Sequence, residues 1–262
     1  MTVAQRIPVL MYHRIGKVHN DWERRYCITP DFFKRHIRRL AEQGMQACSL
    51  ADFFAWLEGR KKLADGSFLL TFDDGFLGVY EYAAPVLHDL SWPATVFLVS
   101  QRIGGRDEWC KKVNADVPTY PLLERGQIET MRGIGFTFHS HTRLHPDLTT
   151  LSDNRLSEEL AGSRQDLEEL LGEQVAYLAY PYGRYDERVL NAARAAGYQA
   201  AFSTQPGFNH RGVDPYRIRR LDVFGTDTPA MLWRKVLFGC NDGSWRQTLR
   251  YYGGRLRQRL GI

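Results

Sequence analysis

The sequence of 262 residues has few cysteines and no long apolar stretch, and both absences narrow the classes of protein it can represent. Its four cysteines lie far apart without a Cys-x-x-Cys pair, which argues against a zinc–thiolate site or a disulfide framework and fits a reducing compartment. The run IPVLMY near the N-terminus is too short for the hydrophobic region of a signal peptide, and no stretch approaches a membrane span. We therefore expect a cytoplasmic protein.

Positive charge is concentrated at the C-terminus. The chain has 35 Lys+Arg and 30 Asp+Glu, and residues 244–262 contain five arginines and no acid, so the remainder is neutral (30 against 30). A neutral body offers no broad surface for phosphates, which argues against nucleic-acid binding. We predict a domain over 1–243 and a basic tail over 244–262 that contacts an anionic membrane peripherally, at its inner face. A terminal helix docked on the body, with a solvated basic face, is the alternative.

Strand and helix patterns alternate along almost the whole chain, without an internal linker. Such alternation predicts a parallel sheet, either open or closed into a barrel, with chemistry gathered at the C-terminal ends of its strands. Short apolar runs predict strands at 7–15, 67–72, 94–99, 134–140, 175–180, 198–203 and 216–223. Amphipathic segments with capping residues predict helices at 29–44, 49–59, 79–90, 121–133, 152–172 and 186–197.

Two adjacent carboxylates, Asp73 and Asp74, follow the apolar run in FLLTFDDGF (68–76). Asp-Asp-Gly is common in turns, because glycine supplies a permissive backbone and aspartate tolerates turn conformations. The alternative is that the two carboxylates do different work, one binding a metal and the other accepting a proton. Their place at a strand's C-terminal end favours the second interpretation.

Three histidines lie within seven residues of the segment HSHTRLHPDL (139–148), again at a strand end. His141 and His145 are four residues apart in a turn or short helical segment, so both imidazoles can point at one ion. With one carboxylate they would form a two-His, one-Asp site that leaves positions for water and substrate. We interpret His139 as a supporting or structural residue.

The motifs TFDDG, SHTRLH and PYG, in this order and at these strand ends, resemble the polysaccharide deacetylase family with the NodB homology domain (carbohydrate esterase family 4). The resemblance runs from about Ile7 to Asp222. It implies a single-domain α/β fold, a distorted (β/α)7-type barrel, and a hydrolase that uses one divalent metal ion, most often Zn²⁺, with Co²⁺ or Ni²⁺ as alternatives. It further implies that Asp73 is the catalytic base.

By the same resemblance, Asp74, His141 and His145 match the metal ligands. A bound cation would neutralise much of the repulsion between the two neighbouring aspartates.

Two departures from the family pattern change the expected site. Many members have an arginine two positions before the proline of PYG, where this chain has Ala179. We predict that either Arg219 or Arg220 replaces it, and we name Arg220 as the candidate site residue. Many members also carry a catalytic histidine near the C-terminus, but no histidine follows His210. The opening PVLMYHRI resembles the exopolysaccharide deacetylases that act on poly-N-acetylglucosamine, which makes His13 the expected acid.

The expected function is therefore metal-dependent removal of N-acetyl groups from an amino sugar in a glycan or in a lipid-linked or soluble saccharide. Tyr182 is expected to donate its backbone N–H to the tetrahedral oxyanion. Trp109 and Tyr185 are candidates to stack on sugar rings, with core packing as the alternative for each. A deformylase, an O-acetyl esterase and a non-catalytic carbohydrate-binding relative remain alternative functions.

Overall fold

The structure is a computed structural model that describes residues 5–21, 23–112 and 117–246. Its strands are β1 (Val9–Tyr12), β2 (Arg14–Ile15), β3 (Cys27–Ile28), β4 (Gln46–Ala47), β5 (Ser67–Phe72), β6 (Ala94–Leu98), β7 (Phe136–Ser140), β8 (Tyr177–Ala179), β9 (Ala200–Phe202) and β10 (Leu221–Asp222). Its α-helices are α1 (Pro30–Glu42), α2 (Leu50–Leu57), α3 (Ala84–Asp89), α4 (Arg125–Arg132), α5 (Asp153–Leu171), α6 (Glu187–Ala195) and α7 (Pro229–Phe238).

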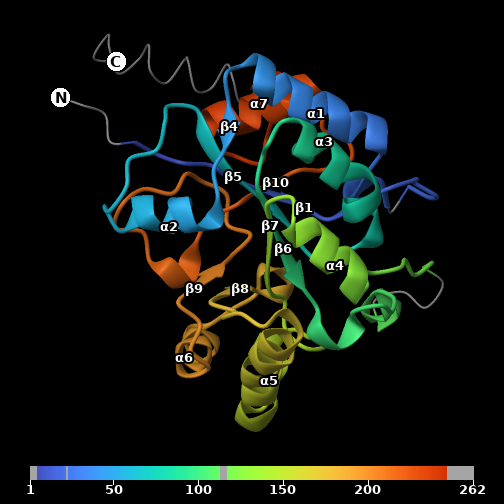
Figure 1. Cartoon of the computed structure of the whole chain (residues 1–262), viewed down its shortest axis with the longest axis vertical. Coiled ribbons are helices and arrows are strands. Elements are labelled where there is room, and N and C mark those ends of the chain that lie inside the picture. The colour runs from blue at the N-terminus through green and yellow to red at the C-terminus, as the bar shows by residue number, and fades with distance from the viewer. Residues whose placement is uncertain (1–4, 22, 113–116, 247–262) are drawn as a thin grey trace.

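The main sheet follows the order β10-β1-β5-β6-β7-β8-β9, with β4 also paired to β5. Every pair within it is parallel, as the alternation of strands and helices predicted. The sheet curls into a half-barrel surrounded by helices (Figure 1), so the predicted barrel-like α/β fold is confirmed. Near the open side, an isolated bridge links Phe202 to Ile218, just before β10.

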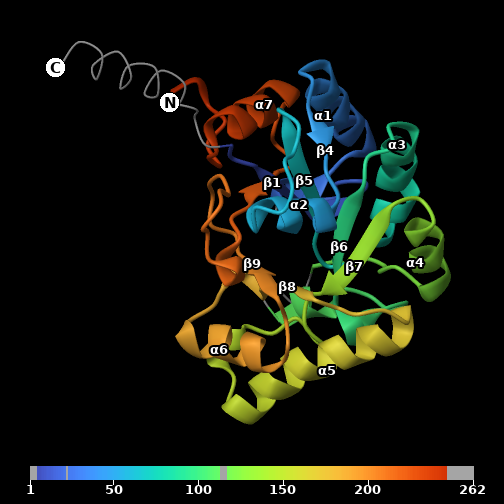
Figure 2. The same ribbon diagram turned by 60° about the vertical axis from the view of Figure 1, so that its left-hand side comes forward.

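The two faces of the curled sheet bury different sets of side chains. One core cluster joins the outer face to helices α1 and α3–α7. The second joins inner-face residues such as Leu69 and Phe97 to α2, whose Phe53, Phe54 and Trp56 fill the curve below the site. Each such buried aromatic side chain contributes about 1.5–3 kcal/mol of apolar burial. Figure 2 shows α2 lying within the curve of the strands, apart from the other helices.

Some predicted boundaries are wrong, for local reasons. The strand expected at 7–15 is divided into β1, which belongs to the main sheet, and β2, which pairs with β3 in a separate two-stranded sheet. The helix expected at 79–90 begins as a π-helical turn (Val79–Ala83) before α3. Most of the strand expected at 216–223 is irregular, and only β10 pairs with β1. Helix α7 was not predicted, although Thr228 caps it and Pro229 occupies its first turn.

The four cysteines form no disulfide, as the sequence predicted. Within the described ranges, no helix combines the length and apolarity needed to cross a bilayer. Residues 247–262, which form most of the predicted basic tail, lie outside the described residues. The domain boundary at 243 and the membrane contact of the tail therefore stay predictions.

Candidate active site

The candidate active site lies on the inner face of the sheet, where β1, β5 and β7 end. The register pairs Met11 of β1 with Thr71 of β5. Because side chains alternate along a strand, His13 and Asp73, each two residues further on, point to the same inner face. His141 follows β7 in the same way. Parallel strands bring their C-terminal ends to one edge, which is how residues far apart in sequence meet here.

Asp74, His141 and His145 form a compact, buried cluster of potential metal ligands. One ligand atom from each residue lies within 4.8 Å of the others. Asp74 Oδ1 is 3.5 Å from His141 Nε2 and 3.3 Å from His145 Nε2. Asp74 Oδ1 is also buried without a hydrogen-bond partner. A buried carboxylate oxygen that no donor satisfies, with two imidazole nitrogens aimed at it, fits a divalent cation.

The protonation states of these three residues fit the same conclusion. His141 Nδ1 lies 2.8 Å from the carbonyl oxygen of Ala179. The carbonyl can only accept, so Nδ1 carries the proton and Nε2 is left as a lone-pair donor. Burial lowers the pKa of His141, and burial together with His141 lowers that of His145 further, so both imidazoles are neutral. Burial and the neighbouring carboxylates of Asp73 and Asp107 raise the pKa of Asp74, which makes its ionised form unfavourable. A bound cation would stabilise that ionised form.

Asp74 occupies an unusual backbone conformation. Its φ of 72° lies in the left-handed region, which few residues other than glycine adopt. Asparagine and aspartate tolerate this region best, and such conformations cluster at functional sites. The turn chemistry of Asp-Asp-Gly is therefore real, and it also turns the Asp74 carboxylate toward the two histidines while Asp73 points elsewhere.

Asp73 is held by Arg220 in a buried, two-pronged ion pair. Arg220 Nη1 donates to Asp73 Oδ1 at 2.6 Å and Nη2 to Oδ2 at 2.8 Å, while Nε donates to the carbonyl of Ser203 at 2.9 Å. Burial alone would raise the pKa of Asp73, but Arg220 and His141 outweigh it and lower that pKa to about 2. Asp73 is therefore ionised and fixed in orientation.

The sequence left Arg219 and Arg220 as alternatives for this place. The structure brings Arg220, which is fully buried, against Asp73. Arg219 is exposed, and its guanidinium donates to the carbonyl of Pro206. The choice between the two depends on which side chain the strand turns inward, a property of register that composition cannot give.

His13 is half-buried beside this pair and faces a carboxylate that the sequence did not single out. Asp222 is registered opposite Met11, so it shares the inner face with His13. Burial lowers the pKa of His13, whereas Asp73 and Asp222 act in the opposite direction. Asn241 holds Asp222 by donating to its Oδ2 at 2.7 Å and accepting from its N–H at 2.9 Å. The signal available in the sequence was the spacing of Asp222 two residues after Arg220.

The PYG motif forms a tight turn that places Tyr182 beside the cluster. Tyr182 has a φ of 58°, and its ring meets that of His145 edge-on at 4.7 Å. Within the described part of the chain, its N–H donates no hydrogen bond. Gly183 is required here: its φ is +67°, and an added Cβ would lie 2.0 Å from Thr204 Oγ1. The turn thus exposes an unused backbone donor next to the ligand residues.

Trp109 and Tyr185 occupy different environments. Trp109 is only 4% exposed, and its ring stacks on that of His145 with the ring centres 4.8 Å apart. It therefore serves in core packing, and its ring face is not accessible to a sugar. Tyr185 is half-buried, stacks on Tyr180 at 4.9 Å and lines a surface groove of about 600 Å³ that Gly183 also lines. His139 packs edge-on against Tyr177, which fits its interpretation as structural.

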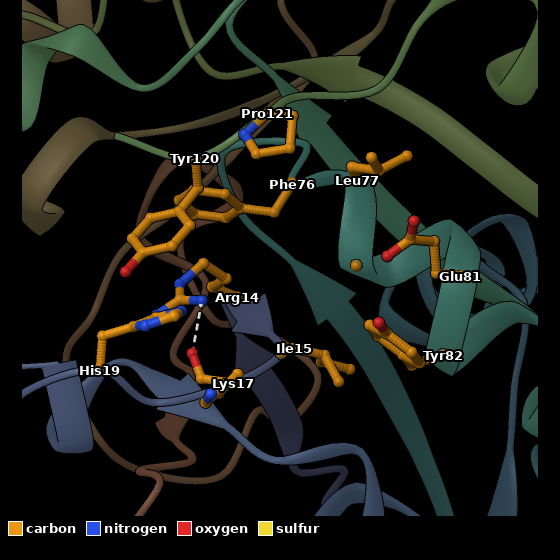
Figure 3. Close-up of a pocket in the computed structure, with 12 residues that line it drawn as sticks. Arg14, Ile15, Lys17, His19, Phe76, Leu77, Glu81, Tyr82, Tyr120 and Pro121 are labelled. Atoms are coloured by element: carbon orange, nitrogen blue, oxygen red, sulfur yellow. Dashed lines mark hydrogen bonds between the residues drawn. The ribbon is translucent and has the colours of Figure 1, made fainter. Parts of the chain in front are cut away.

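A second cavity, of about 180 Å³, lies near the site but does not include it. Figure 3 shows Arg14 and Tyr120 on one side of this cavity and Glu81 and Tyr82 on the other. The guanidinium of Arg14 stacks 3.5 Å from the centre of the Tyr120 ring and forms an ion pair with Glu23 at 2.6 Å. Arg14 belongs to β2, which pairs with β3 in a separate two-stranded sheet and not with the strands that carry the cluster.

Taken together, the cluster can hold one cation beside an ionised carboxylate, a histidine and a free backbone donor, the set of groups that a metal-assisted hydrolase needs. The family model for polysaccharide deacetylase matches residues 60–201, more than half of the chain. The chain belongs to the polysaccharide deacetylase family. The family predicted from the three motifs is thereby confirmed.

Individual relatives agree with this assignment. The protein YxkH of Bacillus subtilis (strain 168) is 29% identical over 218 residues, which are 83% of this chain and 71% of that protein. The poly-beta-1,6-N-acetyl-D-glucosamine N-deacetylase of Staphylococcus epidermidis is 28% identical over 237 residues, 82% of this chain and 78% of that enzyme. The solved structure of IcaB from Ammonifex degensii superposes with a TM-score of 0.75 at 25% identity, covering 89% of this chain and 97% of the other.

Proposed function

We propose that this protein is a metal-dependent N-deacetylase that hydrolyses acetamido groups of an N-acetylated glycan. The observation that carries the proposal is the buried Asp74 oxygen, which lacks a hydrogen-bond donor and faces two neutral histidines. The similarity to enzymes named for poly-beta-1,6-N-acetyl-D-glucosamine supports a substrate of this class.

Asp74, His141 and His145 would hold the metal ion, of which Zn²⁺ best fits two imidazoles and one carboxylate. When bound, the ion supplies Lewis-acid chemistry: it polarises a carbonyl and lowers the pKa of water toward neutrality. That contribution matters here because Asp73, with a pKa of about 2, is a weak base toward ordinary water.

The remaining residues have separate parts in the reaction. Asp73, oriented by Arg220, accepts a proton from the water that attacks the acetamide carbon. The Tyr182 N–H donates a hydrogen bond to the oxyanion that develops on the carbonyl oxygen. Burial lowers the pKa of His13, and Asp73 and Asp222 oppose that shift; in the proposal His13 gives a proton to the amine nitrogen as the C–N bond breaks. The products are acetate and a free amino sugar.

The groove at Gly183 and Tyr185 is the proposed place for sugar units next to the reacting one. Gly183, which lines this groove, directly follows Tyr182, so the proposal places there the sugar units next to the one whose acetamide lies at the cluster. Its wall combines the Tyr185 ring with the charged side chains of Arg184 and Arg217, a mixture of apolar and polar groups that suits sugar faces and hydroxyls.

The cell compartment stays a proposal drawn from the sequence. We propose action inside the cell at the inner membrane face, supported by four cysteines without disulfides and by the basic composition of residues 244–262. A soluble amino sugar in the cytoplasm is the substrate that remains if the tail has no affinity for membranes.

The substrate assignment is tested with metal-free protein reconstituted with Zn²⁺. Oligomers of β-1,6-linked N-acetylglucosamine, an N-formyl analogue and an O-acetylated sugar are incubated in parallel, and released acetate or formate is measured. The proposal predicts zinc-dependent acetate release from the N-acetyl oligomer and slower turnover of the other two. Preferential formate release, or preferential ester cleavage, would replace the N-acetyl assignment.

A further inference from the structure

The segment that carries two of the proposed ligands, residues 141–145 (here the ligand loop), is held in a strained path. Thr142 has a φ of 69° and His145 a φ of 58°, both in the left-handed region although neither is glycine. Conformations of this kind persist only where surrounding contacts hold them. The ligand loop therefore depends on groups outside itself.

Glu159, in the middle of helix α5, supplies such a contact. Its side chain is buried, with 3% of the residue exposed. A single carboxylate oxygen, Oε2, accepts from the backbone N–H of Arg143 and from that of Leu144, each at 3.0 Å. Both donors lie between the two ligand histidines. Within the described residues Glu159 forms no ion pair, so these two N–H groups are its direct partners.

The other contacts of the ligand loop leave these two N–H groups to Glu159. The carbonyls of Thr142 and Arg143 accept from the backbone of Ser100 and Gln101, on the opposite side of the chain. The Arg143 guanidinium pairs with Asp166, which fixes a side chain and leaves the backbone donors untouched. Without Glu159, two consecutive amides of partly buried residues would lose their acceptor.

We propose that Glu159 is a positioning residue for the metal centre: it fixes the backbone between His141 and His145 in the conformation that aims both imidazoles at one ion. It acts on the loop and not on the ion, since the cluster of potential ligands comprises Asp74, His141 and His145 and does not include it. This inference rests on the proposed metal-dependent function. It assigns part of the affinity for the metal to a residue of helix α5 that the family motifs do not contain.

The test compares four metal-free proteins: the unaltered chain, Glu159→Leu, Glu159→Gln and Glu158→Leu. Glu158 is the matched control, because it is the adjacent, exposed glutamate of the same helix and forms its ion pair with Arg155. Zinc affinity is measured by titration against a competing chelator. Exchange of the Arg143 and Leu144 amide hydrogens is followed in the same metal-free samples.

We expect Glu159→Leu to weaken zinc binding by about 10–100-fold, the range observed when residues that orient metal ligands are removed. Its Arg143 and Leu144 amides should exchange faster. Glu159→Gln should stay within about threefold of the unaltered chain, because an amide oxygen also accepts from both N–H groups. Glu158→Leu should match the unaltered chain in both measurements.

Equal zinc affinity of Glu159→Leu and the unaltered chain would overturn the inference and leave the proposed function standing. If the unaltered chain itself bound no zinc, the proposed function would fail first, and the inference with it. Should Glu159→Leu not fold, Glu159→Asp provides the same comparison, because it keeps the charge but withdraws the oxygen from the amides. Zinc affinity of Glu159→Asp equal to that of Glu159→Gln would then refute the role.

Discussion

Replacing Arg220 by methionine should expose how strongly the site depends on a single buried ion pair. The substitution removes both hydrogen bonds to Asp73 and leaves its carboxylate buried without a partner. Breaking a buried pair from one side typically costs about 3–5 kcal/mol. An independent figure comes from the pKa of Asp73, which lies at about 2 instead of 3.8, a difference equivalent to about 2 kcal/mol of stability near neutral pH.

The direction of the pH dependence follows from the same pKa. Because the folded state lowers the pKa of Asp73, its ion pair stabilises the protein fully above about pH 4, and this contribution is lost as the pH falls toward 2. In Arg220→Met, burial without the guanidinium raises that pKa, so Asp73 takes up a proton more readily. The stability difference between the two proteins should therefore be largest at pH 7 and narrow toward pH 4.

The assay is urea unfolding of the metal-free proteins at pH 7 and pH 4. We expect Arg220→Met to lose about 3 kcal/mol at pH 7, and Asp73→Asn in the same chain to recover part of that loss. Arg219→Met is the matched control, since the neighbouring arginine is exposed, and should change stability by less than about 0.5 kcal/mol. A loss below about 1 kcal/mol for Arg220→Met, or the same loss for Arg219→Met, would refute the reasoning.

Three further predictions concern the acid, the substrate groove and the tail. His13→Gln should lower kcat by about 100-fold without changing the metal content; an unaltered kcat would remove His13 as the acid. Tyr185→Ala should raise KM for oligosaccharides several-fold with little change in kcat, and a KM equal to that of the parent would exclude the groove as a sugar site. A protein ending at Gly243 should lose binding to anionic liposomes at low salt, where each arginine near the surface contributes about 1 kcal/mol. Equal, salt-independent sedimentation of the long and short proteins would discard the membrane contact.

The site residues that could be predicted from the sequence are those that belong to short, contiguous motifs. Asp73 and Asp74 directly follow one predicted strand, and His141 and His145 lie in the segment that follows another. Because the C-terminal ends of parallel strands lie at the same edge of a sheet, the sequence alone predicts that these residues lie close together. The alternation of strands and helices likewise predicted the fold class, since it depends on local periodicity.

What could not be predicted depends on contacts between distant segments. Arg220 meets Asp73 across 147 positions of sequence, and only the register decides that Arg220 and not Arg219 turns inward. Asp222 and Glu159 belong to no motif. Their roles depend on the groups they face in the folded structure, the His13 side chain for Asp222 and two backbone amides for Glu159. Trp109 shows a prediction that failed for the same reason. Its residue type suits sugar binding, but in the folded structure its ring is buried against His145.

The most direct test of the central claim is a parallel measurement of bound metal and acetate release for three proteins: the unaltered chain, His141→Ala and Asp73→Asn. The account predicts about one zinc ion per unaltered chain, loss of both metal and activity in His141→Ala, and retained metal with activity lowered by about 100-fold or more in Asp73→Asn. A His141→Ala protein that keeps its zinc and its turnover would contradict the assignment of the metal centre. A fully active Asp73→Asn protein would contradict the assignment of the base.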